Sequence, residues 1–412
     1  MRISTLQQYT KGLNSIMDNQ TEVNKTQQQV STGRRVLTPA DDPIASTKIL
    51  QLQQDLALND QFQKNMTFAE NRLNLEEATL ASVTENLTRL KELTVQAGGG
   101  TLTITDRQAI AAEAYQIQEA LVDLFNTRDA NGEYIFAGFK GADMPFVQNS
   151  TGRYDYEGDE GQRYLSIGAS TTVATGDNGK ELFVDVEAAK NTFTAGINPN
   201  NTGDMQVNPG FVVDEEAYAE FYPDDIIITF NPESAVSPPA TNYTVRRASD
   251  NRVIDGLFNM GYTSGAKIEV AGISLGMSGE PEPGDEVLVK SSPKQSITDT
   301  VFRLTYGLNT LEDNPVDSAT LDILIEDTLT NLANAQASVS EVVSRVGARL
   351  NVIENTGNLA ADVKIVNQDV LSKLSDVDFA EAVSRLSLQS YLLEAAQQSY
   401  TTISRMSLFD QM

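Results

Sequence analysis

Residues 49–90, ILQLQQDLALNDQFQKNMTFAENRLNLEEATLASVTENLTRL, carry mostly apolar side chains at intervals of seven. One series comprises Leu52, Asn59, Met66, Leu73, Leu80 and Leu87, and the other comprises Ile49, Leu56, Phe62, Ala69, Val83 and Leu90. Such a repeat keeps one face of a helix apolar from end to end, and that face must pack along other helices. Pro43 precedes the repeat and Gly98 follows it, so we predict one long helix from about Pro43 to Gln96.

The C-terminal part of the chain has the same design. No proline follows Pro315, and a second seven-residue series comprises Ile325, Leu332, Val339, Val346 and Ile353. Shorter helices are predicted from Asp106 to about Thr127 and from Ile297 to about Leu311, the latter after the capping sequence Ser296-Ile-Thr-Asp299. The apolar stripes predict that both arms of the chain pack into one bundle that resembles a coiled coil.

The middle of the chain has a different pattern. Ten of the 13 prolines lie between Pro145 and Pro293, and segments such as DIIITF and EVLVK alternate apolar with polar residues, which predicts antiparallel sheet. We therefore predict an α+β protein, in which both chain ends form an elongated antiparallel helical bundle with an inserted all-β domain. The predicted parts are an N-terminal arm (1–140), the insertion (141–295) and a C-terminal arm (296–412). The stretch 191–210 looks irregular and suggests two sub-modules in the insertion.

Composition excludes several classes of function. The chain has 412 residues, a net charge of −27, no Cys and no His, which removes disulfides, thiolate chemistry and the commonest general base and metal ligand. An acidic surface repels phosphate, so we expect no nucleic-acid partner. Asp155, Glu157 and Asp159 alternate in DYEGDEG, but predicted strands flank them instead of the helices of an EF-hand. We interpret them as a hairpin turn and predict no metal, no cofactor and no catalysis.

The sequence also bears on location. No apolar run approaches the roughly 20 residues that a helix needs to span a bilayer, so we expect no membrane insertion. The N-terminal segment MRISTLQQYTKGLNSIMD lacks the apolar core of a secretory signal peptide. We expect a cytosolic protein, or one exported by a route that does not read such a peptide.

The stretch STGRRVLTPADDPIAS, residues 31–46, predicts a corner between two helices. Gly33 would end a first helix of about residues 1–32. Pro43 fits the first turn of the long helix, where its missing N–H costs nothing, and Asp42 is the expected N-cap. The corner (33–43) then folds the terminal helix against the long one.

The two terminal helices carry narrower stripes. The N-terminal stripe holds Leu6, Leu13, Ile16, Val23 and Val30, and the C-terminal stripe, in a helix of about residues 370–412, holds Phe379, Val383, Leu386, Leu393, Ala396, Tyr400 and Ile403. Chain ends are poorly ordered unless something holds them. The residues alone leave open whether the two ends pair with each other or wait for another subunit.

Five motifs are spread over the chain: MRIST at the start, TPADDPIAS (38–46), GEYIFAGFKG (132–141), AGISLGMSGEPEPGDEVLV (271–289) and SRMSLFDQM at the end. With them the chain resembles the flagellar hook-associated protein 3 family of the flagellin superfamily. The resemblance implies an extracellular, non-enzymatic structural protein that joins the hook to the filament of the bacterial flagellum. It implies three partners, which are the first hook-associated protein, flagellin and an export chaperone, together with self-assembly into a ring.

The resemblance also implies which residues meet other subunits. These are the terminal stripes and the corner: Leu6, Leu13, Ile16, Val23, Val30, Arg34, Arg35, Asp41, Asp42, Phe379, Val383, Leu386, Leu393, Tyr400 and Ile403. If the C-terminal helix is an assembly surface, Leu393 and Tyr400 are expected to become buried only in the polymer. Two alternatives remain, namely filament flagellin itself and a secreted coiled-coil adhesin or effector with a ligand-binding β insertion. An enzyme housed in the insertion would lack the histidine that most hydrolytic metal sites use.

Overall fold

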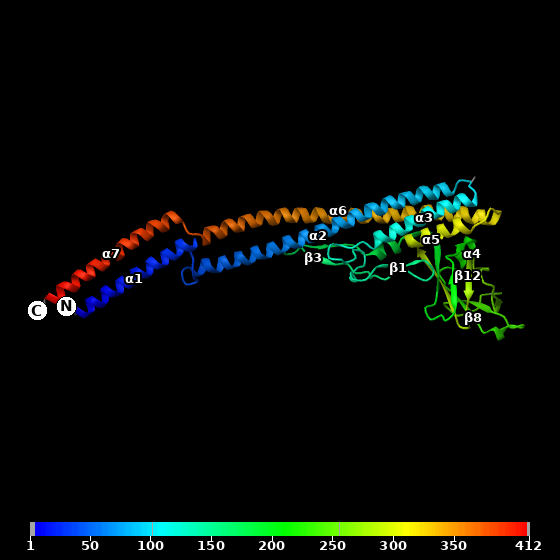
Figure 1. The fold of residues 1–412 in the computed structure, drawn as a ribbon, viewed down its shortest axis with the longest axis horizontal. Helices are drawn as coiled ribbons and strands as arrows, with labels where there is room; N and C mark the ends of the chain where they lie inside the picture. Colours follow the sequence, from blue (N-terminus) through cyan, green and yellow to red (C-terminus); the bar gives the residue numbers. More distant parts are fainter. Residues whose placement is uncertain (1–4, 101, 255, 410–412) are drawn as a thin grey trace. The chain divides into compact units, whose positions relative to one another are not determined.

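The fold was obtained as a computed structural model, which describes residues 5–100, 102–254 and 256–409 (Figure 1). It divides into two compact units. Unit 1 comprises Met1–Met66, Ile167–Ala169 and Glu354–Met412, and unit 2 comprises Thr67–Ser166 and Ser170–Ile353. Each unit is described by itself. None of the helices in the described ranges combines the length and apolar character that a membrane crossing requires.

The helices are α1 (Thr5–Thr32), α2 (Pro43–Ala97), α3 (Ile104–Phe125), α4 (Glu215–Phe221), α5 (Ile297–Thr310), α6 (Pro315–Ser375) and α7 (Phe379–Phe409), with short helical turns η1 (Lys180–Val184) and η2 (Glu233–Ala235). The strands are β1 (Phe146–Gln148), β2 (Tyr154–Tyr156), β3 (Tyr164–Ser166), β4 (Thr172–Ala174), β5 (Glu187–Ile197), β6 (Asp204–Val207), β7 (Phe211–Val212), β8 (Ile226–Asn231), β9 (Asn242–Arg247), β10 (Met260–Gly261), β11 (Lys267–Val270), β12 (Ile273–Glu280) and β13 (Glu286–Lys294). The predicted fold class, helical ends around a β-rich insertion, is confirmed.

In unit 2 the seven-residue repeats form the helical core. Leu73, Leu80 and Leu87 of α2 are fully buried, and so are Val339 and Val346 of α6. Complete burial of one such side chain stabilises the fold by roughly 1.5–3 kcal/mol, so the repeat accounts for much of the packing energy of these helices. Helices α3 and α5 pack side by side (Figure 1).

Local capping explains where the shorter helices begin. Ser296 caps α5 as predicted, because its side chain accepts a hydrogen bond from the backbone N–H of Asp299. Helix α3 begins at Ile104, two residues before the predicted start. The cause is a capping box, in which Thr103 accepts from the N–H of Asp106 and the Asp106 carboxylate accepts from the N–H of Thr103 at 3.0 Å.

The insertion contains two larger sheets that share one core. The first has the strand order β10-β9-β8-β13-β5, and the second has the order β11-β12-β6 with β7 also paired to β12. Phe193 of β5, Ile228 of β8 and Leu275 of β12 are completely buried in the same apolar cluster. The stretch 191–210 is therefore not an irregular separator, since it contains most of β5 and all of β6. Alternate side chains of β5 and β6 pack into one common core.

A buried polar network in unit 2 connects the long helices to the insertion. Glu76 of α2 accepts a hydrogen bond from the N–H of Asp177 at 3.1 Å, and Arg349 of α6 donates to both carboxylate oxygens of Asp177 at 2.7 and 3.0 Å. The second oxygen of Glu76 is buried and has no hydrogen-bond partner among the described residues. Burial, followed by the nearby charge of Asp177, raises the pKa of Glu76 to about 8.

Candidate functional site

The corner between α1 and α2 is built as the sequence predicted. Gly33 has a φ of +70°, a conformation that glycine adopts without steric cost, and α1 ends at the residue before it. Helix α2 begins at Pro43. Asp42 is its N-cap, because one carboxylate oxygen accepts from the N–H of Ala45 at 3.0 Å.

Asp41 holds the corner to α1. One of its oxygens accepts from the N–H groups of Leu37 and Thr38 at 3.2 and 2.8 Å, and the other lies 2.8 Å from Nζ of Lys25. The hydrogen bond from Lys25, followed by those from Thr38, lowers the pKa of Asp41 to about 2. Asp41 is therefore charged at neutral pH, where it ties the turn to the helix.

The corner is also joined to the segment between α6 and α7. Arg34 and Asp376 form an antiparallel bridge, in which the N–H of Arg35 donates to the carbonyl of Ser375 at 2.7 Å. The guanidinium of Arg35 donates to the carbonyl of Leu374 at 2.9 Å and lies 3.6 Å from the Asp42 carboxylate. The N- and C-terminal arms are thus fastened to each other within one chain.

The terminal helices α1 and α7 lie side by side (Figure 1), which decides the question that the sequence left open. Tyr9 and Tyr400 meet edge to face with ring centroids 5.8 Å apart, and Thr26 donates to Gln389 at 2.7 Å. A Cβ at Gly12 would lie 3.1 Å from the Tyr400 ring, so a small residue allows this approach. The ends pair with each other in the single chain.

The predicted interface residues of α1 and α7 divide into two groups by the exposure of their side chains. Those half-buried along α1 and α7 are Ile16, Val23, Val30, Leu386, Leu393 and Tyr400, and those exposed on the same helices are Leu13, Phe379 and Val383. Tyr400 packs on Tyr9 in the single chain, so part of its side chain is covered before assembly, and its complete burial in the polymer stays a prediction. Leu393 is likewise half-buried in the single chain. The side chains of Leu6 and Ile403 lie outside the described part.

Unit 1 also exposes apolar residues that the sequence did not lead us to predict as interface residues. The α7 stripe consists of Leu388, Tyr391 and Leu392, and Tyr391 is 69% exposed. The α6 stripe consists of Leu359, Val363, Val366 and Val370, whose spacing of four, three and four places them on one helix face. An exposed apolar patch of this kind indicates a surface for another protein.

A sequence signal for the α6 stripe existed. The buried series of α6 ends at Ile353, and its next positions in steps of seven are Ala360 and Asn367, which are poor core residues. The apolar side chains move instead to the neighbouring face, which holds the α6 stripe. A second apolar face on one helix is the pattern that indicates a second partner.

The interpretation of DYEGDEG as a hairpin turn is wrong, because β2 pairs with β1 and β3 pairs with β4, so Glu157 and Asp159 lie in the loop that joins two separate hairpins. Asp155 lies in β2 and accepts from Nδ2 of Asn149 at 2.9 Å, whereas one oxygen of Asp159 accepts from the N–H groups of Phe139 and Gly161 at 2.9 and 2.7 Å. Within the described ranges, no group of three or more acidic side chains is arranged to hold a metal ion.

Calcium is therefore expected to leave the thermal stability unchanged. Backbone N–H groups already occupy one oxygen of Asp159, and too few acidic side chains of the described residues gather there to hold a cation. Thermal melting with excess CaCl₂ and with EDTA should give the same midpoint. A large calcium-dependent rise would contradict the prediction that Asp155, Glu157 and Asp159 hold no metal ion.

Comparison with known proteins agrees with this architecture. Residues 3–140 match the model of the bacterial flagellin N-terminal helical region, and residues 323–411 match that of the C-terminal helical region. Over 219 residues the chain is 36% identical to flagellar hook-associated protein 3 of Salmonella typhimurium, which covers 53% of this chain and 66% of that protein. The E. coli protein of the same name is 36% identical over 183 residues and is covered over 57% of its length.

A solved structure of a relative gives the same result, and the match covers nearly the whole of that relative's chain. The crystal structure of flagellar hook-associated protein 3 from Legionella pneumophila is 30% identical, with a TM-score of 0.54, and the match covers 79% of this chain and 98% of that chain. The fold and both helical ends thus define a structural protein of the flagellin type. Within that class, the chain belongs to the flagellar hook-associated protein 3 family. This is a family of structural components of the bacterial flagellum and not of enzymes.

Proposed function

We propose that this protein joins the hook to the filament of the bacterial flagellum, as an extracellular structural subunit. The observation that carries the proposal is the exposed apolar surface of unit 1. After α1 and α7 have paired, the α6 and α7 stripes still face solvent, with Leu359 64% and Tyr391 69% exposed. A chain that functioned alone would be more stable if such residues were buried within it. We therefore expect other subunits to bury them.

The partners follow from the family. The first hook-associated protein would contact one side of a ring of these subunits, and flagellin would contact the other. The terminal helices and the corner would supply the contacts, and the arms 1–140 and 296–412 would carry the β insertion 141–295 outside them. Arg34 is exposed and its guanidinium has no ion pair at 4.0 Å or less among the described residues, so it suits an acidic neighbour better than Arg35, whose guanidinium binds within the chain.

Export would precede assembly. The chain would leave the cell unfolded through the flagellar type III export channel. An export chaperone would hold the C-terminal helix before export. The absence of cysteine removes any disulfide that would have to form after transit.

Filament flagellin is the second candidate. The chain is 24% identical to the flagellin of Clostridium tyrobutyricum over 387 residues, which covers 92% of each protein. The 36% identity to hook-associated protein 3 of Salmonella typhimurium favours the junction function, although it covers a shorter stretch.

A deletion strain distinguishes the two candidates. Loss of a junction protein should leave cells without attached filaments while full-length flagellin accumulates in the medium. Complementation with the intact gene should restore attached filaments, and this restoration is the control. Loss of the major flagellin would instead leave little flagellin in the medium. Normal filaments on the deletion strain would contradict both functions.

A further inference from the structure

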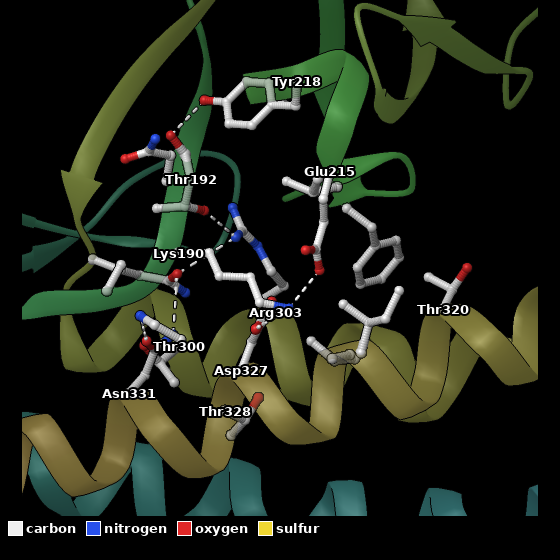
Figure 2. A pocket seen from close by; sticks show the side chains of 18 of the residues that line it. Lys190, Thr192, Glu215, Tyr218, Thr300, Arg303, Thr320, Asp327, Thr328 and Asn331 are labelled. Atoms are coloured by element: carbon white, nitrogen blue, oxygen red, sulfur yellow. Dashed lines mark hydrogen bonds and ion pairs between the residues drawn. The ribbon is translucent and has the colours of Figure 1, made fainter. Parts of the chain in front are cut away.

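Unit 2 contains a cavity of about 170 Å³ (Figure 2). Residues from β5, α4, α5 and α6 line it. One part of the wall is apolar and includes Phe211, Val212, Ile323 and Leu324. For comparison, an apolar protein cavity of roughly 150 Å³ can hold benzene. The space therefore suits a ligand of about that size.

Arg303 of α5 supplies a hydrogen-bond donor to this cavity. Its terminal nitrogens donate to the Thr192 hydroxyl and to the Phe193 carbonyl, both at 2.7 Å, but its Nε is buried without a hydrogen-bond partner in the described part of the chain. No carboxylate of the described residues lies within 4.0 Å of this guanidinium. Burial lowers the pKa of Arg303 to about 10, which leaves the side chain protonated at neutral pH. A buried N–H of a cation is thus left without an acceptor.

Asp327 of α6 supplies the complementary acceptor. Its Oδ1 is buried and accepts no hydrogen bond from the residues that the structure describes. Nζ of Lys190 lies 3.6 Å from this oxygen, which is too long for a hydrogen bond, because Lys190 donates to Glu215 instead (Figure 2). Burial, together with the nearby charge of Glu215, raises the pKa of Asp327 and outweighs the opposing effect of Lys190.

The charges around the cavity limit the class of ligand. Two cationic side chains, Lys190 and Arg303, face two acidic ones, Glu215 and Asp327, so the lining has no net charge. Because attraction and repulsion oppose each other for either sign of charge, this lining favours neither an anion nor a cation, whereas burial would cost either ion its hydration. A buried polar atom that makes no hydrogen bond is destabilising, and a ligand that hydrogen-bonded to both Nε of Arg303 and Oδ1 of Asp327 would remove this penalty.

We propose that the cavity binds a small uncharged molecule with an apolar body and an amide-like head. The carbonyl oxygen of the head would accept a hydrogen bond from Nε of Arg303, and its N–H would donate to Oδ1 of Asp327. The apolar body would contact Ile323 and Leu324. This site does not depend on the assembly function, and its failure would leave the proposed function untouched.

Benzamide is the probe, because it combines a benzene-sized body with a neutral amide. Ligand-detected saturation-transfer NMR on the full chain should show benzamide binding. Benzoate and benzamidinium have nearly the same shape but carry one negative and one positive charge, and each should bind at least about tenfold more weakly. Absence of benzamide binding would overturn the proposal, and so would tighter binding of either ion.

A surface variant locates the probe in this cavity. Ala219 is exposed on α4 and lines the cavity, so Ala219→Phe should cover it without disturbing the core and should abolish benzamide binding. Ala235→Phe makes the same substitution at an exposed residue that does not line the cavity, and it should bind like the wild type. Thermal melting checks that both variants are folded. Equal binding by the two variants would show that benzamide binds elsewhere and would contradict the assignment.

Discussion

Replacing Tyr391 by glutamate is expected to leave the isolated chain folded and to abolish filament attachment. The side chain is 69% exposed, so the substitution removes little packing from the single chain, and its melting midpoint should change little. In an assembled interface the same ring would be buried, and a tyrosine that acts as a hot spot contributes about 2 kcal/mol or more. A charge placed in a dry interface adds a desolvation cost. Cells that produce Tyr391→Glu should therefore swim poorly and release flagellin into the medium.

Ser390→Glu is the matched control. It introduces the same charge at the neighbouring exposed position of α7, which lies outside the α7 stripe. This variant should keep its filaments. Detection of both proteins outside the cell separates a defect in export from a defect in assembly. Normal motility of Tyr391→Glu, or a variant that unfolds as a monomer, would contradict the assignment of the α7 stripe to an interface.

Glu76→Gln is expected to change the pH dependence of stability. The folded chain raises the pKa of Glu76 from 4.5 to about 8, so between these values the folded state binds more protons than the unfolded state. The free energy of unfolding therefore falls as pH rises through this window, by up to about 1.4 kcal/mol per pH unit. Glutamine remains neutral and lacks this loss. The variant should match the wild type near pH 5 and exceed it by about 3 kcal/mol or more at pH 9.

Denaturant unfolding at pH 6, 7, 8 and 9 measures this difference. Glu70→Gln is the control, because it makes the same change at an exposed position of α2 in the same unit, and it should follow the wild type at every pH. A Glu76→Gln variant that is less stable than the wild type throughout the range would show that Glu76 is charged in the folded protein.

Local sequence signals predicted the helices well, because a helix and its ends depend on residues that are close together in the chain. Pro43 and Gly98 bound α2 almost as expected, and the series from Leu73 to Leu87 is buried as its spacing required. The capping box of Thr103 and Asp106 was visible in the sequence and was missed. The pairing of β5 with β13 joins residues far apart in the chain, and no local pattern specifies such a register.

The candidate site was harder to predict, for two physical reasons. A stripe on a helix does not reveal which neighbour covers it, so Tyr400 was assigned to another subunit although Tyr9 of the same chain packs on it. The cavity depends on Arg303 and Asp327, which lie on different helices and meet only through tertiary packing. Which of their polar atoms make hydrogen bonds is set by this packing and not by any pattern in the sequence.

Site-specific photo-crosslinking at position 391 in intact flagella tests the central claim most directly. A photoreactive phenylalanine derivative would replace Tyr391, and a second protein would carry it at Ala235, an exposed residue of the insertion. The proposed function predicts that light joins position 391 to a neighbouring axial subunit, which mass spectrometry should identify as the first hook-associated protein, flagellin or a second copy of this chain. Assembled flagella in which position 391 forms no crosslink, while the derivative remains reactive in the purified protein, would contradict the claim that the terminal helices join the hook to the filament.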